Sequence, residues 1–178
     1  MKILIVVDMQ NDFITGPLGT PEAQSIVPLV KKKIEEYREK DWVIAFTQDT
    51  HDADYLNIQE GRKLPVVHTI QYNPGWEVCD ELMEVACEED LFVEKPTFGF
   101  IHWDAVFAQL EEQYGEKIET IELVGVCTSI CVISNAIILK ALMPETPIAV
   151  DAKCCACVTP ETHAAAITAM KTCQIDII

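Results

Sequence analysis

A cysteine at a predicted junction between a strand and a helix is the first residue of this chain that could do chemistry. The segment from Leu123 to Ala136 is predicted to form a buried strand ending at Gly125, a short turn, and a helix with Cys131 in its opening turn. A thiol there lies near the positive end of the helix dipole and near unpaired backbone N–H groups, which favour the thiolate. Because a thiolate attacks carbonyl carbon, Cys131 is a candidate nucleophile.

Two further candidates follow predicted strands. Asp8 comes directly after the apolar run Ile3–Val7, and Lys95 comes after Leu91–Glu94. Taken alone, such an aspartate is often a turn cap and such a lysine a solvated strand end. In a parallel sheet, however, ligands bind beyond the carboxyl ends of the strands, which meet along one edge. There Asp8 could act as a general base beside Cys131, and Lys95 would keep the carboxylate ionised and lower the thiol pKa.

A metal site is predicted in the polar segment after the strand Trp42–Thr47. Asp49 and His51 follow that strand, and Glu60 and His68 come later in the segment. Aspartate and histidine bind divalent ions such as zinc and leave positions open for water or substrate. A single loop histidine is usually a surface residue, but two of the four histidines of the chain fall here. That concentration favours a metal centre.

The other aromatic and imidazole side chains have simpler interpretations. Phe13 and Phe98 lie close in sequence to the two candidates at strand ends. Aromatic residues so placed usually pack in a core, but near a thiol nucleophile they could hold a flat ring. His102 and His163 fit helix surfaces or caps, and we assign them no role.

The eight cysteines are Cys79, Cys87, Cys127, Cys131, Cys154, Cys155, Cys157 and Cys173. Most fall in apolar segments, where a free cysteine behaves as a small hydrophobic residue. Nothing in the sequence indicates export, so disulfides are not expected. A zinc site built from Cys127, Cys131, Cys154 and Cys157 fits the ligand type, but these pairs are not CxxC hooks on flexible turns. Buried reduced thiols are therefore the favoured interpretation for most of them.

Composition excludes several classes of function. The 178 residues suit one domain spanning 1–178, and a hydrophobic content of 49% predicts a packed core. A formal net charge of −16 argues against nucleic acid or an anionic membrane as a partner. No apolar run approaches the roughly 20 residues of a membrane span. The segment Met1–Asp8 is too short for a signal peptide, so we expect a cytoplasmic protein whose first strand begins here.

Strand and helix patterns alternate along the chain. Strands are predicted at Ile3–Val7, Trp42–Thr47, Leu91–Glu94, Glu119–Gly125, Pro147–Val150 and Ile175–Ile178, and helices at Ser25–Lys40, His102–Tyr114, Ile130–Leu142 and Pro160–Thr172. This order predicts an α/β fold of three α/β/α layers around a mostly parallel sheet of about six strands. The segment from Gln48 to Gly75 is predicted to be a long irregular loop, which is usually functional. No GxGxxG or GxxxxGK[ST] motif is present, so the sheet is not expected to bind a nucleotide.

With these residues assembled, the chain resembles the isochorismatase-like cysteine hydrolases, and within them the nicotinamidases. The resemblance covers nearly the whole chain, and its motifs are specific in their order and spacing. The segments that carry it are Val7–Phe13, Asp49–His51, Leu64–His68, Asn73–Trp76, Glu94–Phe98 and Gly125–Val132.

The resemblance implies a catalytic triad of Asp8, Lys95 and Cys131. Asp8 would take the thiol proton and later return it to the leaving amine, Cys131 would form a thioester, and Lys95 would hold both anions. The family also has a cis peptide bond before the residue that matches Cys127. The backbone N–H groups of Cys127 and Cys131 would form the oxyanion hole, worth roughly 3 kcal/mol per donor.

The resemblance also implies a ligand set and a ring-binding site. Asp49, His51 and His68 match the metal ligands of nicotinamidases, and Glu60 matches a fourth ligand of some members. The ion would be Zn²⁺ or else Fe²⁺ or Mn²⁺, and it would bind the pyridine nitrogen of the substrate. Phe13 and Phe98 match aromatic residues around the ring.

Three positions depart from the family pattern. Ser129 replaces a frequent aspartate, Thr69 replaces a frequent cysteine, and Cys157 replaces a frequent glycine. The leading expectation remains hydrolysis of a small carboxamide, with nicotinamide first and another amide or a ureido compound as the alternative. A non-catalytic small-molecule binder on the same scaffold is disfavoured by the complete triad. Family members commonly form homo-oligomers, so an oligomer stays open.

Overall fold

The centre of the molecule is a six-stranded sheet in which every neighbouring pair of strands is parallel. The computed structural model describes residues 1–178 and has the strand order β3-β2-β1-β4-β5-β6. The strands are β1 (Lys2–Val7), β2 (Val43–Asp49), β3 (Leu91–Lys95), β4 (Thr120–Val126), β5 (Ile148–Ala156) and β6 (Asp176–Ile177). The order changes direction between β1 and β4, where sheets of this kind form their ligand crevice.

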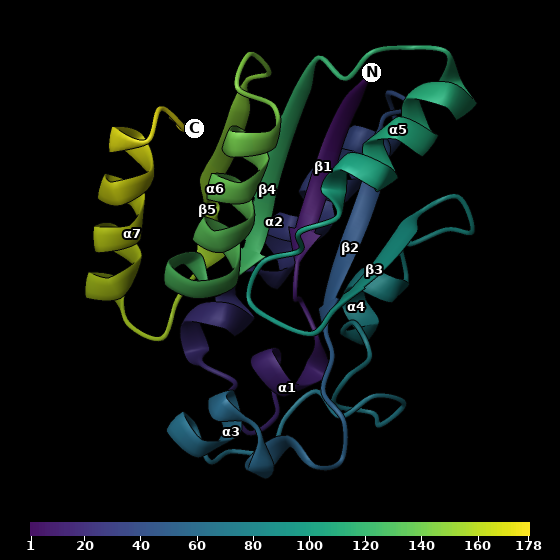
Figure 1. Ribbon diagram of the computed structural model, residues 1–178. Coiled ribbons are helices and arrows are strands. Elements are labelled where there is room, and N and C mark those ends of the chain that lie inside the picture. Colours follow the sequence, from purple (N-terminus) through teal and green to yellow (C-terminus); the bar gives the residue numbers. More distant parts are fainter.

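Helices cover both faces of the sheet (Figure 1). The helices are α1 (Asn11–Ile14), α2 (Pro21–Arg38), α3 (Gln59–Lys63), α4 (Asp80–Met83), α5 (Trp103–Tyr114), α6 (Ile133–Leu142) and α7 (Pro160–Thr172). Helices α5, α6 and α7 pack on one face, and α2 and α4 pack on the other. This confirms the predicted three-layer α/β/α fold. None of the helices is both long enough and apolar enough to cross a membrane.

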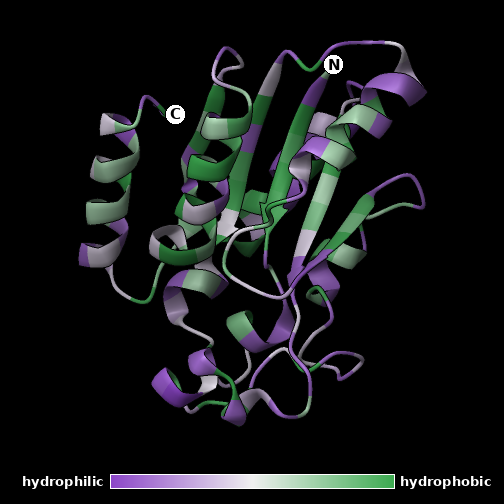
Figure 2. Ribbon diagram, in the orientation of Figure 1, coloured by the Kyte–Doolittle hydropathy of each residue, from purple (hydrophilic) through white to green (hydrophobic).

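Strand β1 is apolar from Ile3 to Val7 because both of its faces are covered. Ile3, Ile5 and Val7 pack into the core beneath α5, α6 and α7, whereas Leu4 and Val6 pack into the core beneath α2. Buried parallel strands are expected to be continuously hydrophobic for this reason. Figure 2 shows the resulting hydrophobic centre between the more polar outer surfaces of the helices.

Two predicted boundaries were wrong by four residues or more. Helix α2 begins at Pro21 rather than Ser25, because the Thr20 hydroxyl accepts a hydrogen bond from the Ala23 N–H at 3.0 Å and caps the helix. Strand β5 continues beyond Val150 to Ala156, although polar residues interrupt its apolar pattern.

The extra length of β5 is taken up by a bulge against β4. Leu123 pairs with Val150, but Gly125 pairs with Cys155, so the register shifts between these two pairs. The pairing then continues to the carboxyl ends of both strands.

The segment predicted to be an irregular loop from Gln48 to Gly75 is also partly regular. Gln48 and Asp49 complete β2, and a one-turn 3₁₀ helix, Tyr55–Asn57, is followed by α3. In Figure 1, α1 and α3 lie below the carboxyl edge of the sheet, where they enclose the ends of the strands.

Candidate active site and metal centre

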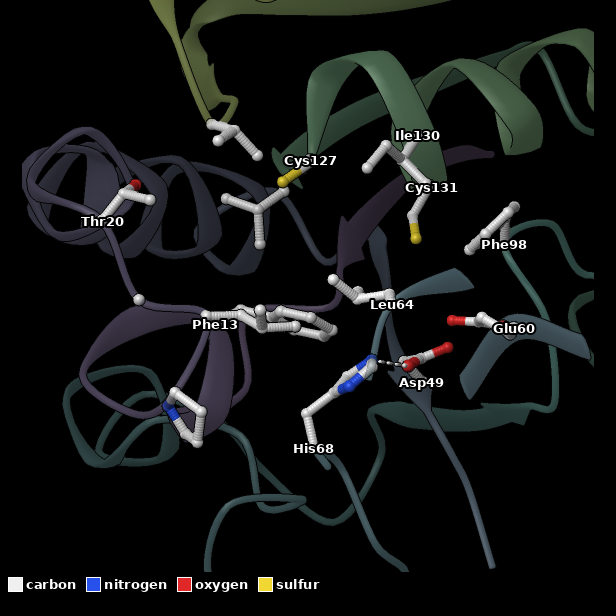
Figure 3. A pocket seen from close by; sticks show the side chains of 15 residues that line it. Phe13, Thr20, Asp49, Glu60, Leu64, His68, Phe98, Cys127, Ile130 and Cys131 are labelled. Carbon is white, nitrogen blue, oxygen red and sulfur yellow. Dashed lines mark ion pairs between the residues drawn. The ribbon is translucent and has the colours of Figure 1, made fainter. Parts of the chain in front are cut away.

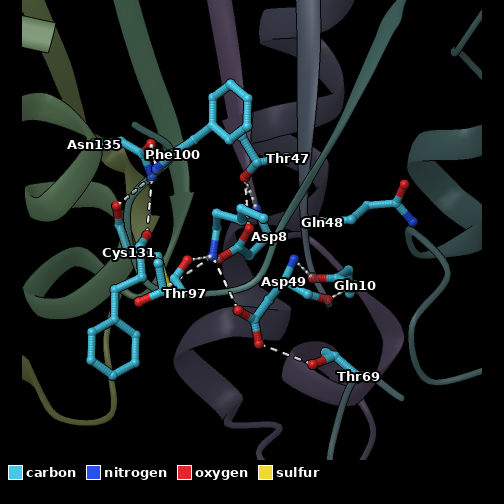
Figure 4. Close-up of polar contacts among 12 residues, drawn as sticks. Asp8, Gln10, Thr47, Gln48, Asp49, Thr69, Thr97, Phe100, Cys131 and Asn135 are labelled. Carbon is cyan, nitrogen blue, oxygen red and sulfur yellow. Dashed lines mark hydrogen bonds and ion pairs between the residues drawn. The ribbon is translucent and has the colours of Figure 1, made fainter. Parts of the chain in front are cut away.

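The structure brings the predicted triad together at the carboxyl edge of the sheet. Lys95 Nζ lies 2.7 Å from Asp8 Oδ2 and 3.6 Å from Cys131 Sγ. Asp8 follows β1, Lys95 ends β3, and Cys131 follows β4, so the parallel topology gathers residues that are far apart in sequence. All three side chains are buried. The site therefore combines a thiol, an ammonium and a carboxylate within direct contact (Figure 4).

Neighbouring polar groups hold the triad in place. The Thr47 hydroxyl donates a hydrogen bond to Asp8 Oδ1 at 2.6 Å, which leaves Oδ2 for Lys95. Lys95 Nζ also donates to the backbone carbonyl of Thr97 and to Asp49 Oδ1, at 3.2 Å in each case. The Lys95 ammonium therefore has three acceptors around it, two carboxylates and one backbone carbonyl.

The expected lowering of the thiol pKa was wrong for this site. Burial raises the pKa of Cys131, the Asp8 charge adds to that rise, and Lys95 only partly opposes it. Burial also raises the pKa of Asp8, against the effect of Lys95. Burial disfavours the charged form of Lys95, but Asp8, Cys131 and Asp49 outweigh it and raise its pKa. The resting site therefore holds a neutral thiol beside a carboxyl group with raised proton affinity.

The nucleophile sits on a π-helical turn, Thr128–Val132, which joins β4 to α6. The peptide bond between Val126 and Cys127 is cis, as the family resemblance implies. In Figure 3 the Cys131 sulfur points into a cavity, and Asp49 and His68 line the opposite wall of that cavity.

Asn135 anchors this turn, and the sequence analysis did not identify it. Its Nδ2 donates to the Cys131 carbonyl at 2.9 Å, and its Oδ1 accepts from the N–H groups of Phe100 and Trp103 Nε1, each at 3.0 Å. The side chain is completely buried. A polar residue four positions after the nucleophile, in a helix otherwise rich in apolar residues, was the signal that could have found it.

Asp49, His51 and His68 also come together, as predicted. Their ligand atoms all lie within 4.8 Å of one another, and all three residues are buried. Asp49 Oδ2 is 3.0 Å from His51 Nε2 and 3.6 Å from His68 Nε2. His68 Nδ1 lies 2.7 Å from the Val66 carbonyl, which fixes the ring and turns Nε2 toward the cluster.

A divalent metal fits these residues. The buried His51 Nε2 faces carboxylate oxygens of Asp49 and Glu60, at 3.0 and 3.6 Å, so a neutral ring that presents its lone pair there needs a cation between these acceptors. One carboxylate and two imidazoles are a common ligand set for zinc, with a position left open. Glu60 Oε1 is 3.6 Å from His51 Nε2, yet Glu60 does not belong to the compact three-residue set.

Asp49 belongs to both parts of the site. Its Oδ1 accepts from Lys95, whereas its Oδ2 faces the two imidazoles and accepts from the Thr69 hydroxyl at 2.9 Å. Thr69, where the family resemblance implies a frequent cysteine, therefore donates a hydrogen bond to Asp49, a candidate metal ligand. Gln10, which the sequence analysis missed, clamps the backbone of Asp49 by accepting from its N–H at 2.8 Å and donating to its carbonyl at 2.9 Å.

One cavity of about 420 Å³ opens onto both groups (Figure 3). Cys131 lines it on one side and Asp49 and His68 line the other, with Phe13 and Phe98 in the wall between them. The Phe13 ring meets the His68 ring edge to face at a centroid distance of 5.5 Å. Nine of its fifteen lining residues are hydrophobic, as is typical of a site for a small, largely apolar molecule.

The structure also tests the interpretations of the four-cysteine zinc site and of His163. The four-cysteine zinc site is not formed, because only Asp49, His51 and His68 gather three or more such ligands closely enough. His163 is not a simple surface residue or cap, since its Nδ1 lies 2.9 Å from the hydroxyl of Thr128 in the nucleophile turn.

Comparison with known proteins assigns the family. The sequence profile of the isochorismatase domain matches residues 2–178, and the chain belongs to the isochorismatase family of hydrolases. It is 25% identical to the nicotinamidase of Saccharomyces cerevisiae, over 85% of this chain and 87% of that protein. It is 29% identical to a probable inactive nicotinamidase of Arabidopsis thaliana, over 94% of this chain and 87% of that one.

A solved structure supports the same assignment. The pyrazinamidase of Pyrococcus horikoshii in complex with zinc is 28% identical and matches with a TM-score of 0.80, covering 99% of this chain and 98% of that chain.

Proposed function

We propose that this protein hydrolyses a small carboxamide, and that its substrate is nicotinamide, converted to nicotinate and ammonia. The observation that carries the proposal is that the Cys131 thiol faces Asp49 and His68, two of the three candidate metal ligands, across one cavity. A flat pyridine carboxamide has a reactive group at one end and a ring nitrogen at the other. Relatives named nicotinamidase and pyrazinamidase support this choice.

The reaction begins with a proton transfer. Asp8 takes the Cys131 proton, which its raised pKa favours, and Lys95 holds the carboxyl group and the sulfur together. The thiolate attacks the amide carbon, and Asp8 returns the proton to the leaving nitrogen as ammonia departs. Water then hydrolyses the Cys131 thioester, with Asp8 again accepting a proton.

The negative charge that develops on the amide oxygen needs hydrogen-bond donors. The backbone N–H groups of Cys127 and Cys131, at the start of the π-helical turn, are our candidates for this oxyanion hole. Each such donor is worth roughly 3 kcal/mol in the transition state. Asn135 supports this role by tethering the carbonyl of Cys131, so that the turn keeps its position.

Asp49, His51 and His68 would hold a divalent ion, with Zn²⁺ favoured by the imidazole ligands and Fe²⁺ or Mn²⁺ as alternatives. When bound, the ion supplies a Lewis-acidic position for the ring nitrogen. Phe13 and Phe98 would flank the ring, and Glu60, at the cavity wall, would serve as a fourth ligand.

Ammonia release from nicotinamide by metal-loaded protein tests the proposal. Turnover is expected for the wild type and is expected to vanish in Cys131→Ala. If another amide or a ureido compound releases ammonia and nicotinamide and pyrazinamide do not, the substrate belongs to the alternative class. If no amide is turned over at all, a non-catalytic binding function would replace the proposal; the Arabidopsis relative is itself named a probable inactive nicotinamidase.

A further inference from the structure

Cys127 and Cys157 lie side by side next to the cavity, and the proposed reaction uses neither thiol. Val126 of β4 pairs with Ala156 of β5, and these two cysteines are the next residues on the two strands. Neighbouring strands are about 4.8 Å apart, which lies within the Cα separation that a disulfide requires. All eight cysteines are free, and Cys157 is one of the neighbours that raise the pKa of Cys127, in agreement with this closeness.

The two thiols differ in environment. Cys127 is partly exposed and lines the cavity, whereas Cys157 is buried beside Ser129, with 2.9 Å between its Sγ and the serine hydroxyl. Burial opposes ionisation of Cys157, but hydrogen bonds from Ser129 and Thr162 outweigh it and lower its pKa. Burial and the neighbouring Cys157 raise the pKa of Cys127 to about 12. One thiol of the pair is thus accessible, and the other is the better resolving thiolate.

Ser129, in the π-helical turn that carries the nucleophile, contacts the Cys157 sulfur and so ties this thiol to the turn. The bulge in β5 restores pairing at Cys155 and so carries Cys157 to the level of Cys127.

We propose that Cys127 and Cys157 form a dithiol modification site that small disulfides oxidise reversibly to an intramolecular disulfide. The Cys127 sulfur attacks a small disulfide from the cavity, expels one thiolate and forms a mixed disulfide. The Cys157 thiolate then attacks the Cys127 sulfur, forms the protein S–S bond and expels the second thiolate. Two protein thiols are oxidised, one small disulfide is reduced, and the two protons pass to the released thiolates.

Oxidation also lowers turnover, an effect that rests on the proposed function. The new bond draws the Cys127 side chain toward β5, and with it the residue whose N–H would stabilise the oxyanion. Misplacing such a group by about 1 Å can cost about a hundredfold in rate, so a loss of at least about tenfold is expected.

Peptide mapping tests the site without any assay of activity. Cys131→Ala protein that also carries Cys173→Ser, which removes the exposed thiol, is treated with hydroxyethyl disulfide and digested under non-reducing conditions. Mass spectrometry should show a Cys127–Cys157 cross-link that disappears after dithiothreitol. No cross-link, or a cross-link from Cys127 to a different cysteine, would overturn the proposal.

The activity arm compares Cys157→Ser with Cys173→Ser as the matched control. After the same treatment, Cys173→Ser should lose at least about tenfold in turnover and recover with dithiothreitol, whereas Cys157→Ser should keep its rate within about twofold. A complete cross-link without loss of turnover would overturn the effect on activity. Absence of turnover before oxidation would count against the proposed function alone, since the mapping result stands independently.

Discussion

The triad and the metal set are neighbours at one edge of the sheet, yet they differ in how complete they are. In the triad, the Lys95 ammonium contacts the carboxylates of both Asp8 and Asp49, so each of these buried acidic groups has a cation of the protein beside it. In the metal set, the imidazole nitrogens of His51 and His68 both face Asp49 Oδ2, and no lysine or arginine is paired with that oxygen. The first group is complete without a ligand, whereas the second needs one.

The difference follows from the origin of the residues. Asp8 follows the buried strand β1 and Lys95 ends the edge strand β3, and the pairing of both strands with β2 fixes their positions. His68 comes from a loop and is held by a single hydrogen bond from its ring to the chain. A reactive group on a rigid element can be preorganised by folding alone, while a ligand set on a loop gains its final order from the ion it binds.

Breaking the charge balance of the triad should have the largest effect. Lys95→Met leaves Asp8 and Asp49 as buried carboxylates facing each other, so turnover should fall about 1,000-fold or more and stability by about 3–5 kcal/mol. Urea denaturation and ammonia release measure the two quantities. Lys95→Met combined with Asp8→Asn should recover much of the stability but none of the turnover. Turnover within tenfold of wild type in the single variant would show that the ammonium is not needed.

Emptying or disrupting the metal set should have the next largest effect. Zinc should raise the melting temperature of the wild type, by an amount equivalent to about 2.7 kcal/mol at a hundredfold excess over Kd, because the ion binds only the folded ligands. His51→Ala should lose this shift and lose about a hundredfold in turnover. His102→Ala, an exposed histidine outside the site, is the matched control and should behave as wild type. An equal zinc shift in His51→Ala would place the ion elsewhere.

Asn135 links the nucleophile turn to the loop that carries Phe98, so its loss should affect rate more than binding. Asn135→Leu should lower kcat about tenfold, leave KM within about twofold, and cost about 1–3 kcal/mol of stability, because buried groups lose their partners. Asn135→Asp keeps the acceptor for Phe100 and Trp103 and should be milder in stability. A variant with lower stability but unchanged kcat would reduce Asn135 to a packing role.

The aromatic wall should contribute least. Phe98→Leu is expected to raise KM for nicotinamide about threefold to tenfold, because part of the ring contact is lost, and to change kcat little. Phe92→Leu makes a close control, since Phe92 has the same exposed fraction of 42% but stacks on Phe46, away from the cavity. Equal effects of the two substitutions on KM would argue against a ring site at Phe98.

The parts that sequence could predict are those governed by strong local patterns. An apolar strand precedes each of Asp8, Lys95 and Cys131. These strands were enough to predict the parallel sheet and to predict that the three residues meet at its carboxyl edge. The continuation of β5 past Asp151 could not be predicted, because a bulge lets polar residues interrupt a strand. The raised pKa of Cys131 was also beyond prediction, since it depends on how completely the surrounding chain excludes water.

The role of Asn135 could not be predicted from the sequence for a related reason. Its value lies in four hydrogen bonds to residues of another segment and to the turn before it, and none of these partners is fixed by sequence spacing except the carbonyl of Cys131. Long-range polar contacts of this kind depend on the packed fold, while amphipathic periodicity depends only on the element itself.

The most direct test of the central claim is to trap the covalent intermediate. Metal-loaded protein is mixed with excess nicotinamide, quenched in acid within a single turnover, digested and examined by mass spectrometry. The account predicts a nicotinoyl group on the peptide that contains Cys131, and none in Cys131→Ala protein. Release of nicotinate with no acyl group on Cys131, together with turnover by Cys131→Ala, would contradict it.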